Sequence, residues 1–306
     1  MIRLHYPNEE TLAEEHYVAV LDYVTSKSND KIDDIYQYIR NLFPSLGVTR
    51  DRKDFSWLRN FILADVATLE NWAVNQKKNL NFDFFKKLYL NRFAKDSTTF
   101  VDREGTYNAY SFLSKMDFHV CPYCDEEFID TVKTSEGDRR TADIDHFLPK
   151  IHLPGLAMCF YNLIPSGKGC NQIMNKTEIE ANPYDPSIED ESKFFQDTPI
   201  GKIVDCMTDN EIKIRLHTEG KMVRNNGVLG LEERYNNRKC ELRQLFKLKS
   251  LLTPENLASL NKTGFEVECI RAAVGQPYPS GRGQDIHRKL RHDLLNVRGL
   301  IADGLP

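Results

Sequence analysis

The sequence lacks any long hydrophobic run. Its 306 residues are 41% hydrophobic, but the apolar residues never continue for the roughly 18 positions that a membrane-spanning helix needs. The first fifteen residues, MIRLHYPNEETLAEE, contain no apolar core of the kind found in a signal peptide. We therefore expect no membrane contact and a cytoplasmic location.

Cysteine is also scarce, and its count is odd. Seven cysteines in 306 residues, without a leader, argue against a disulfide framework and for reduced thiols in the cytoplasm. We expect three of them, Cys206, Cys240 and Cys269, to pack in cores because their neighbours are apolar.

Positive charge is not in excess either. The net charge of −4 excludes a chain that binds nucleic acid through its overall charge. Residues 201–306, however, contain 18 Lys and Arg and 13 Asp and Glu, a net charge of +5, which leaves 23 and 32, net −9, in residues 1–200. This asymmetry predicts two surfaces with different partners.

Residues 1–117 have the pattern of an N-terminal helical domain. Apolar residues recur at spacings of three and four in four segments, at 12–24, 31–43, 55–74 and 82–93. Residues 183–306 predict a second domain of a hairpin and helices. Its predicted strands are 201–208 and 211–218, with a turn at Asp209-Asn210. Helices are expected at 231–252 and at 285–301, the latter with its basic residues on a solvated face.

The segment between them, residues 118–182, contains most of the residues suited to chemistry. CPYC at 121–124 places two thiols on one tight turn, which is typical of a zinc knuckle. A redox CxxC is chemically possible, but no thioredoxin-like context surrounds it. Cys170 offers a third thiolate, while Gly167 stands where a second knuckle would have its other cysteine. The fourth ligand remains open between Cys159, His119 and water.

A second group is rich in oxygen and nitrogen donors. Asp145 and His146, in DIDHFLPK, put a carboxylate beside a candidate base at the end of a predicted strand. Asn171 is expected at the start of a short helix, with its amide oxygen facing Asp145. One carboxylate and one amide suit Mg²⁺ or Mn²⁺ completed by water and phosphate oxygens. Lys150 and Lys176 are placed in the sequence to meet flanking phosphates.

The order CPYC, DIDH, NL-IP and CN-x-x-x-x-K resembles the HNH nucleases, which have the ββα-metal or His-Me finger. The likeness covers roughly residues 118–178. Within that family, the DHF-x-PK form is most similar to the HNH subunit of the Septu anti-phage system, whose relatives include retron-associated effectors paired with an ABC-type ATPase. The implied fold is α+β and predominantly helical, with the finger and its zinc knuckle between helical regions.

The resemblance also implies roles for individual residues. Asp145 and Asn171 would bind the catalytic divalent cation, His146 would be the general base, and Asn162 would brace the loop of the finger. Cys121, Cys124 and Cys170 would hold a structural zinc ion. The departure at Gly167 concerns the zinc geometry and not the catalytic residues.

These residues predict a metal-dependent endonuclease that hydrolyses phosphodiester bonds. DNA is favoured as the substrate, RNA including tRNA is an alternative, and the modest charge suggests that a partner, plausibly an ABC-type ATPase, docks on the acidic helical domain. A different class of function is a non-enzymatic, zinc-dependent module that binds nucleic acid or protein.

Overall fold

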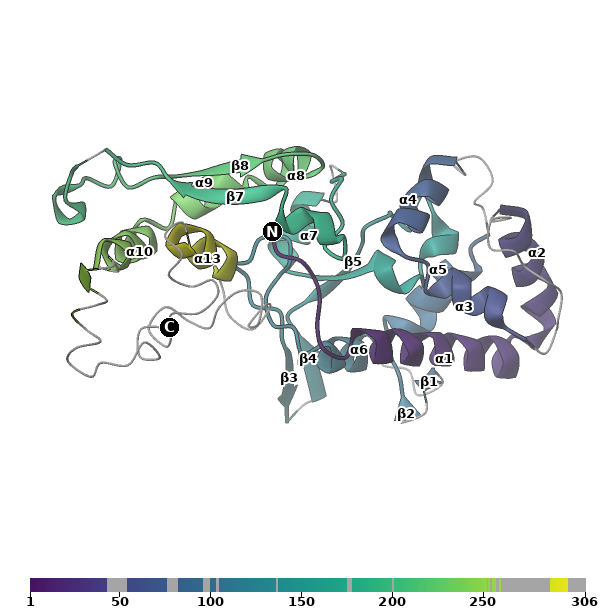
Figure 1. Ribbon diagram of the computed structural model, residues 1–306. Helices are drawn as coiled ribbons and strands as arrows, with labels where there is room; N and C mark the ends of the chain where they lie inside the picture. Colours follow the sequence, from purple (N-terminus) through teal and green to yellow (C-terminus); the bar gives the residue numbers. More distant parts are fainter. Residues whose placement is uncertain are drawn as a thin grey trace. The chain divides into compact units, whose positions relative to one another are not determined.

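The computed structural model describes the chain in segments (Figure 1). They are residues 1–42, 54–75, 82–95, 100–102, 105–135, 137–174, 178–199, 201–251, 253, 255–256, 259 and 287–296. Helices predominate, and each described sheet is a pair of antiparallel strands. The expected α+β, mainly helical class is therefore confirmed. In the described part, no helix is long and apolar enough to cross a membrane.

The chain divides into two compact units. An N-terminal unit comprises His5–Phe118 and Phe128–Asn171, and a C-terminal unit comprises Met1–Leu4, His119–Glu127 and Gln172–Pro306. The division into domains at 1–117, 118–182 and 183–306 stays a prediction. The contact-based units instead associate CPYC with the C-terminal residues, and DIDH with the N-terminal helices.

Six described α-helices come first in the N-terminal unit. They are α1 (Glu9–Lys27), α2 (Ile32–Leu42), α3 (Ser56–Ile62), α4 (Val66–Asn75), α5 (Phe84–Leu88) and α6 (Ala109–Met116). The four predicted amphipathic segments correspond to α1 to α5, with 55–74 split into α3 and α4. A π-helix, η3 (Tyr89–Phe93), continues α5. In α1 the residues Leu12, His16 and Val20 are buried at a spacing of four, as one helix face requires.

Aromatic side chains fill the centre of this unit. Phe61, Phe93, Phe112 and Phe160 are fully buried, and Phe93 and Phe112 pack edge to face with ring centroids 5.7 Å apart. His16 lies among them with its Nε2 2.9 Å from the carbonyl oxygen of Met158. Burial lowers the pKa of His16 to about 4, so the ring is neutral at physiological pH and its hydrogen bond fixes the segment around Met158.

Three small strand pairs complete the unit. They are β1 (Val101–Asp102) with β2 (Gly105–Thr106), β3 (Thr131–Thr134) with β4 (Gly137–Arg140), and β5 (Asp143–His146) with β6 (Leu163–Ser166). In the last pair, Asp143 lies opposite Ser166 and His146 opposite Leu163. Helix α7 (Lys168–Met174) follows β6 after one residue. The order strand, strand, helix brings the DIDH segment and Asn171 into one local structure.

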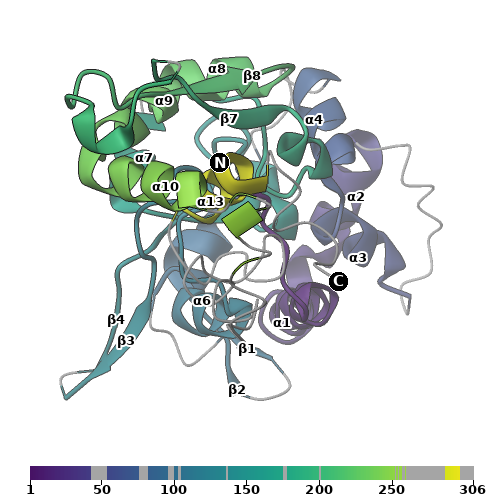
Figure 2. The ribbon, with the colours of Figure 1, turned by 60° about the vertical axis from the view of Figure 1, so that its left-hand side comes forward.

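The C-terminal unit is built on a different hairpin from the one predicted. β7 (Ser192–Gln196) pairs with β8 (Ile214–Thr218), and the two are drawn side by side in Figures 1 and 2. The predicted first strand, 201–208, is wrong: Val204–Cys206 is a 3-10 helix. β7 pairs instead because its alternation buries Ser192 and Phe194 on one face. Glu211 closes the intervening loop by accepting hydrogen bonds from Lys202 and from the backbone of Thr208.

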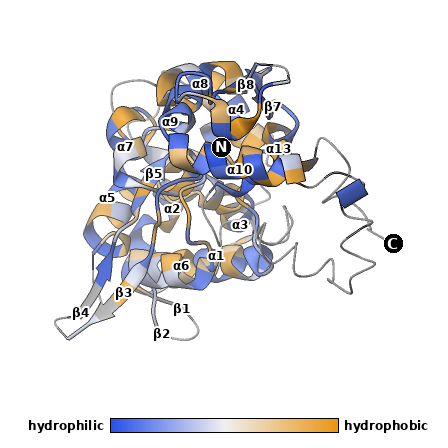
Figure 3. Ribbon diagram, turned by 90° about the vertical axis from the view of Figure 1, so that its left-hand side faces the viewer, coloured by the Kyte–Doolittle hydropathy of each residue, from blue (hydrophilic) through white to orange (hydrophobic). Residues whose placement is uncertain are grey.

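Helices α8 (Met222–Leu229), α9 (Leu231–Asn236), α10 (Lys239–Leu251) and α13 (Arg288–Asn296) complete the described part of this unit. The single helix expected at 231–252 is interrupted between α9 and α10. α10 and α13 both carry hydrophobic and hydrophilic residues (Figure 3), and α13 packs against β7 and α10.

The solvated basic face expected on α13 is wrong at its start. Arg288 and Lys289 are buried, and Lys289 Nζ lies 3.3 Å from Asp293 Oδ2. The same Asp293 oxygen accepts a hydrogen bond from the backbone amide of Phe194. These charges therefore dock the helix and are not displayed to solvent.

Candidate active site and metal centre

On β5, the two carboxylates and the candidate base lie on opposite faces of the strand. Alternation along the strand puts Asp143 and Asp145 on one face, both half-buried, and Ile144 and His146 on the other, both buried. His146 is the last residue of the strand, and its side chain is 5% exposed. A carboxylate pair and an imidazole thus come from one short strand.

The hydrogen bonds of His146 fix its tautomer. Nε2 lies 3.1 Å from the carbonyl oxygen of Ala157, and because a carbonyl only accepts, Nε2 carries the hydrogen. Burial, and next the positive charge of Lys150, lower the pKa of His146 to about 3. The ring is therefore neutral at pH 7, and Nδ1 presents a lone pair. This is the state of a histidine that can accept a proton.

Lys150 occupies the space beside that lone pair. Its Nζ lies 3.2 Å from His146 Nδ1 and 5.1 Å from the ring centroid of Tyr89. Burial lowers the pKa of Lys150, while the carboxylate of Asp145 acts in the opposite direction. The lysine therefore lies close to both the candidate base and the candidate cation ligand. That placement supports its predicted role at a phosphate; Lys176 lies outside the described residues.

Asn171 has a hydrogen-bond partner on β5. Its Nδ2 donates to Asp143 Oδ2 at 2.9 Å, and Asp143 shares a strand face with Asp145. The expected approach of the amide oxygen to Asp145 stays a prediction. Asn171 also lies in the middle of α7 and not at its start. Because the amide nitrogen is used, the amide oxygen remains for another donor or a cation.

Asn162 braces the segment between the two strands. Its Oδ1 accepts from the backbone amide of Leu148 at 2.7 Å, and its Nδ2 donates to the carbonyls of Leu148 and Leu156. The side chain is completely buried. One amide thus holds together both arms of the loop that carries Lys150 and Ala157, the two partners of His146.

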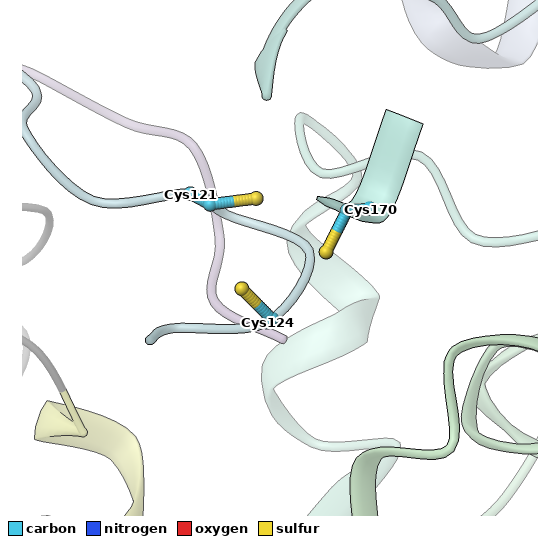
Figure 4. Close-up of side chains that lie close together, drawn as sticks. All are labelled: Cys121, Cys124 and Cys170. Atoms are coloured by element: carbon cyan, nitrogen blue, oxygen red, sulfur yellow. The ribbon is translucent and has the colours of Figure 1, made fainter. Parts of the chain in front are cut away.

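Three of the cysteines form the candidate metal centre. The sulfurs of Cys121, Cys124 and Cys170 lie within 4.8 Å of one another and are buried, and Figure 4 shows them pointing toward a common point. Three thiolates suit Zn²⁺ and fit neither Mg²⁺ nor Ca²⁺. This confirms the predicted grouping of the three thiols as a possible metal site.

The fourth ligand is not Cys159. That thiol is buried elsewhere and donates to the carbonyl of Phe61, with its sulfur 3.4 Å from the oxygen. Among the described residues, His119 does not lie with the three thiols either. Gly167 supplies its carbonyl oxygen to the amide of Asn171. Beyond the three thiols, no further Cys, His, Asp or Glu in the described part completes the centre.

The turn that carries Cys121 and Cys124 is held by the C-terminal helices. Tyr235 donates to the carbonyl of Cys124 at 2.6 Å. The backbone amide of His287 donates to the carbonyl of Asp125, and that of Lys289 to Asp125 Oδ2. A metal that fixed this turn would therefore also stabilise the position of α9 and α13, which bond to it.

The two remaining described cysteines differ from expectation. Cys206 and Cys240 are exposed, so the prediction that they pack in cores is wrong, and Cys269 lies outside the described residues. Apolar neighbours in the sequence were misleading here because Cys206 ends a 3-10 turn and Cys240 lies on the outer side of α10.

Sequence reasoning missed two residues of the site. Asp143 was given no role from the sequence, although the acidic alternation in DIDH already placed it on the face of Asp145. Tyr89 was missed altogether. It comes from the N-terminal helices, 57 positions before His146 in the sequence, and only the fold brings it to the base.

No protein-family model matches this chain, and no curated protein or solved structure matches it.

Proposed function

We propose that the chain is an HNH-type endonuclease that hydrolyses phosphodiester bonds, with β5, β6 and α7 as its ββα-metal finger. The observation that carries the proposal is His146: a buried neutral imidazole whose Nε2 is held by Ala157, so that Nδ1 is its proton acceptor. Asp145 precedes it, and Asn171 follows on the helix of the same local structure. A zinc-stapled structural module alone would need none of these three.

The chemistry assigns one task to each side chain. His146 Nδ1 accepts a proton from the attacking water, which makes the oxygen a better nucleophile toward phosphorus. Lys150, which donates to the same nitrogen in the structure, turns to a nonbridging phosphate oxygen when the substrate arrives. Asp145 and the amide oxygen of Asn171 would hold Mg²⁺ or Mn²⁺, and a cation bound there would supply positive charge to the phosphate and to the leaving oxygen.

The three cysteines have a separate, structural task in this proposal. Cys121, Cys124 and Cys170 would hold Zn²⁺, for which thiolates are suitable ligands. The donor sets divide the two metals: sulfur for the zinc and oxygen for the catalytic cation. Chelation of zinc should therefore loosen the fold, whereas removal of Mg²⁺ or Mn²⁺ should stop the reaction and leave the fold intact.

The test is cleavage of supercoiled plasmid DNA by the full chain with Mg²⁺ or Mn²⁺. We expect the wild type to nick or linearise the plasmid and Asp145→Ala to lose at least about a hundredfold in rate, because it removes the charged ligand of the cation. The matched control is Asp83→Ala, which removes an exposed carboxylate paired with Lys87 in the same unit. Equal loss in both variants would refute the assignment.

Substrate delivery is proposed to depend on a partner. A net charge of −4 provides little nonspecific attraction to DNA, and the resemblance to Septu and retron-associated effectors suggests an ABC-type ATPase and a role in anti-phage defence. Purification of the tagged chain from its host tests this. Co-elution of an ATPase supports the proposal, and a chain that elutes alone and cleaves DNA at full rate contradicts it.

RNA is the alternative substrate, because the finger contacts one phosphate and its neighbours. Parallel digestion of plasmid DNA and total tRNA decides between them. The alternative class, a zinc-dependent binding module, predicts binding without cleavage of either nucleic acid under every metal condition, with the partner present.

A further inference from the structure

We propose that Tyr89 is a positioning residue for the candidate base. Its ring forms an aromatic seat that holds the imidazole of His146 and the ammonium of Lys150 in fixed orientation toward one phosphate. The inference rests on the proposed nuclease function for its kinetic consequences. The orientation of the His146 ring can be measured without any nuclease assay.

Tyr89 contacts both functional side chains at once. The ring centroids of Tyr89 and His146 are 4.4 Å apart at an interplanar angle of 79°, an edge-on arrangement. Lys150 Nζ lies 5.1 Å from the Tyr89 centroid, over the face of the ring. Aromatic quadrupoles favour both arrangements, because the ring edge is positive and the face negative. One side chain thus contacts both partners.

The Tyr89 ring is itself well fixed. Its hydroxyl donates to the carbonyl of Ile144 on β5, with 3.4 Å between the oxygens, and the side chain is 6% exposed. Burial raises the pKa of Tyr89 to about 12, so the hydroxyl keeps its proton. Tyr89 therefore bridges the helix that carries it and the strand that carries His146.

The backbone at this position is unusual. Tyr89 begins the π-helix η3, and the amide of Ala94 donates to its carbonyl five residues back, at 2.8 Å. A π-helical turn rotates the side chains that follow relative to an α-helix, and such turns are frequent at functional sites. Phe93, the last residue of the same turn, points into the aromatic core. Because of the π turn, one short segment places Phe93 in the aromatic core and Tyr89 against the candidate base, His146.

The hydrogen bonds of His146 leave one motion of the imidazole possible, and the ring of Tyr89 prevents it. Ala157 fixes the Nε2 end, and once Lys150 turns from Nδ1 to the phosphate, this single hydrogen bond permits rotation of the imidazole about its axis. The edge-on contact with Tyr89 restricts this rotation. Nδ1 therefore keeps one orientation, with Lys150 Nζ beside it. Orientation of this kind is worth large factors in rate, since a misplacement of about 1 Å can cost about a hundredfold.

The test compares Tyr89→Leu, Tyr89→Phe and Phe93→Leu in the full chain. Tyr89→Leu keeps an apolar side chain and removes the ring. Tyr89→Phe keeps the ring and removes only the 3.4 Å hydrogen bond. Phe93→Leu removes a buried ring of the same π turn that does not stack on His146, and so it controls for lost core packing.

The first measurement is the ¹⁵N resonance pattern of the His146 ring, without DNA or added metal. We expect the wild type, Tyr89→Phe and Phe93→Leu to show one Nε2–H tautomer, and Tyr89→Leu to show averaged nitrogen shifts from a mobile ring. The second is cleavage of supercoiled plasmid DNA with Mn²⁺. Tyr89→Leu should lower kcat by about tenfold or more with a smaller change in KM, and Tyr89→Phe should restore most of it.

Tyr89→Leu with wild-type nitrogen shifts and kcat overturns the proposal, and so does an equal loss in Phe93→Leu. If Tyr89→Leu does not fold, Tyr89→Met carries the same expectation, because methionine adapts to irregular space in a core. A wild-type chain that cleaves no nucleic acid refutes the proposed function instead. In that case the ring nitrogens alone still decide whether Tyr89 orients His146.

Discussion

Asn171 Nδ2 lies 2.9 Å from Asp143 Oδ2, so a strand residue two positions before Asp145 holds the side-chain amide of a residue on α7. The bond uses the nitrogen of the amide and directs its oxygen elsewhere. In the proposed nuclease, that oxygen and the carboxylate of Asp145 are the protein ligands of the catalytic cation. Asp143 is then the outer carboxylate that orients one of them, a common arrangement around metal sites.

Asp143→Ala is expected to weaken the binding of the catalytic metal without abolishing the reaction. Loss of such an outer partner typically costs about ten- to a hundredfold in metal affinity, so the Mn²⁺ concentration for half-maximal plasmid cleavage should rise by about that factor. The rate at saturating Mn²⁺ should change less. Asp130→Ala, a half-buried carboxylate just before β3, is the control; an unchanged Mn²⁺ requirement in Asp143→Ala contradicts the assigned role.

Metal analysis of the purified chain is expected to find about one equivalent of zinc, which Cys124→Ser should lose. The same variant should expose the C-terminal helices to exchange, since Tyr235 and His287 bond to the backbone that follows Cys121. Hydrogen–deuterium exchange over α9 and α13 measures this. Cys240→Ser, which changes an exposed thiol, should retain zinc. Full zinc in Cys124→Ser would exclude the knuckle as the site.

His287 should make stability depend on pH in the neutral to alkaline range. Burial disfavours its charged form, but hydrogen bonds to Glu126 and Glu241 outweigh this and raise its pKa from 6.5 to about 9. A pKa raised by folding adds stability that is fully present below about pH 6.5 and is lost as the pH rises through about 9. His287→Asn keeps a residue that tolerates the left-handed backbone at φ 57°.

The free energy of unfolding of His287→Asn should fall below that of the wild type by roughly 1 to 2 kcal/mol at pH 6, after allowance for solvent screening. The difference should shrink toward zero above pH 9. Urea unfolding at several pH values provides the curve, and His217→Asn, an exposed histidine on β8 paired with Glu219, is the control. A difference that grows with pH would contradict the ion pairs.

Asn162→Ala should destabilise the fold and slow cleavage together. The variant leaves the half-buried amide and carbonyl of Leu148 and the buried carbonyl of Leu156 without their partner, which costs roughly 2 to 4 kcal/mol. The loop that carries Ala157 and Lys150 then loses its brace. Thermal unfolding should show the loss of stability, and plasmid cleavage well below the Tm should still show a reduced rate. Wild-type activity in a destabilised variant would limit Asn162 to a structural role.

The sequence alone indicated most of the helical framework and the strand and helix that carry DIDH and Asn171. Apolar spacing predicted α1 to α5, because each buries one face in the aromatic core. The CPYC turn and Cys170 were recognisable as one thiol group because sulfur ligands have few other uses at that spacing. DIDH predicted a strand that ends at His146. Alternation along a strand decides which side chains share a face, and the sequence shows that alternation directly.

Long-range pairing was not recoverable in the same way. The strand 201–208 was misassigned because its apolar residues resembled a strand, whereas β7 pairs with β8 across a loop closed by Lys202 and Glu211. The burial of Lys289 depends on Asp293 and β7, and the contact between Tyr89 and His146 spans two separate segments. Such contacts are products of tertiary packing, and no local pattern encodes them.

The most direct test of the account is plasmid cleavage by His146→Ala beside the wild type, with the zinc content and thermal unfolding of both proteins measured in parallel. Removal of the general base should slow cleavage by about 10²- to 10⁴-fold, while zinc content stays at the wild-type level and the fold remains intact. Cleavage by His146→Ala at the wild-type rate, under the same Mg²⁺ or Mn²⁺ conditions, would contradict the account.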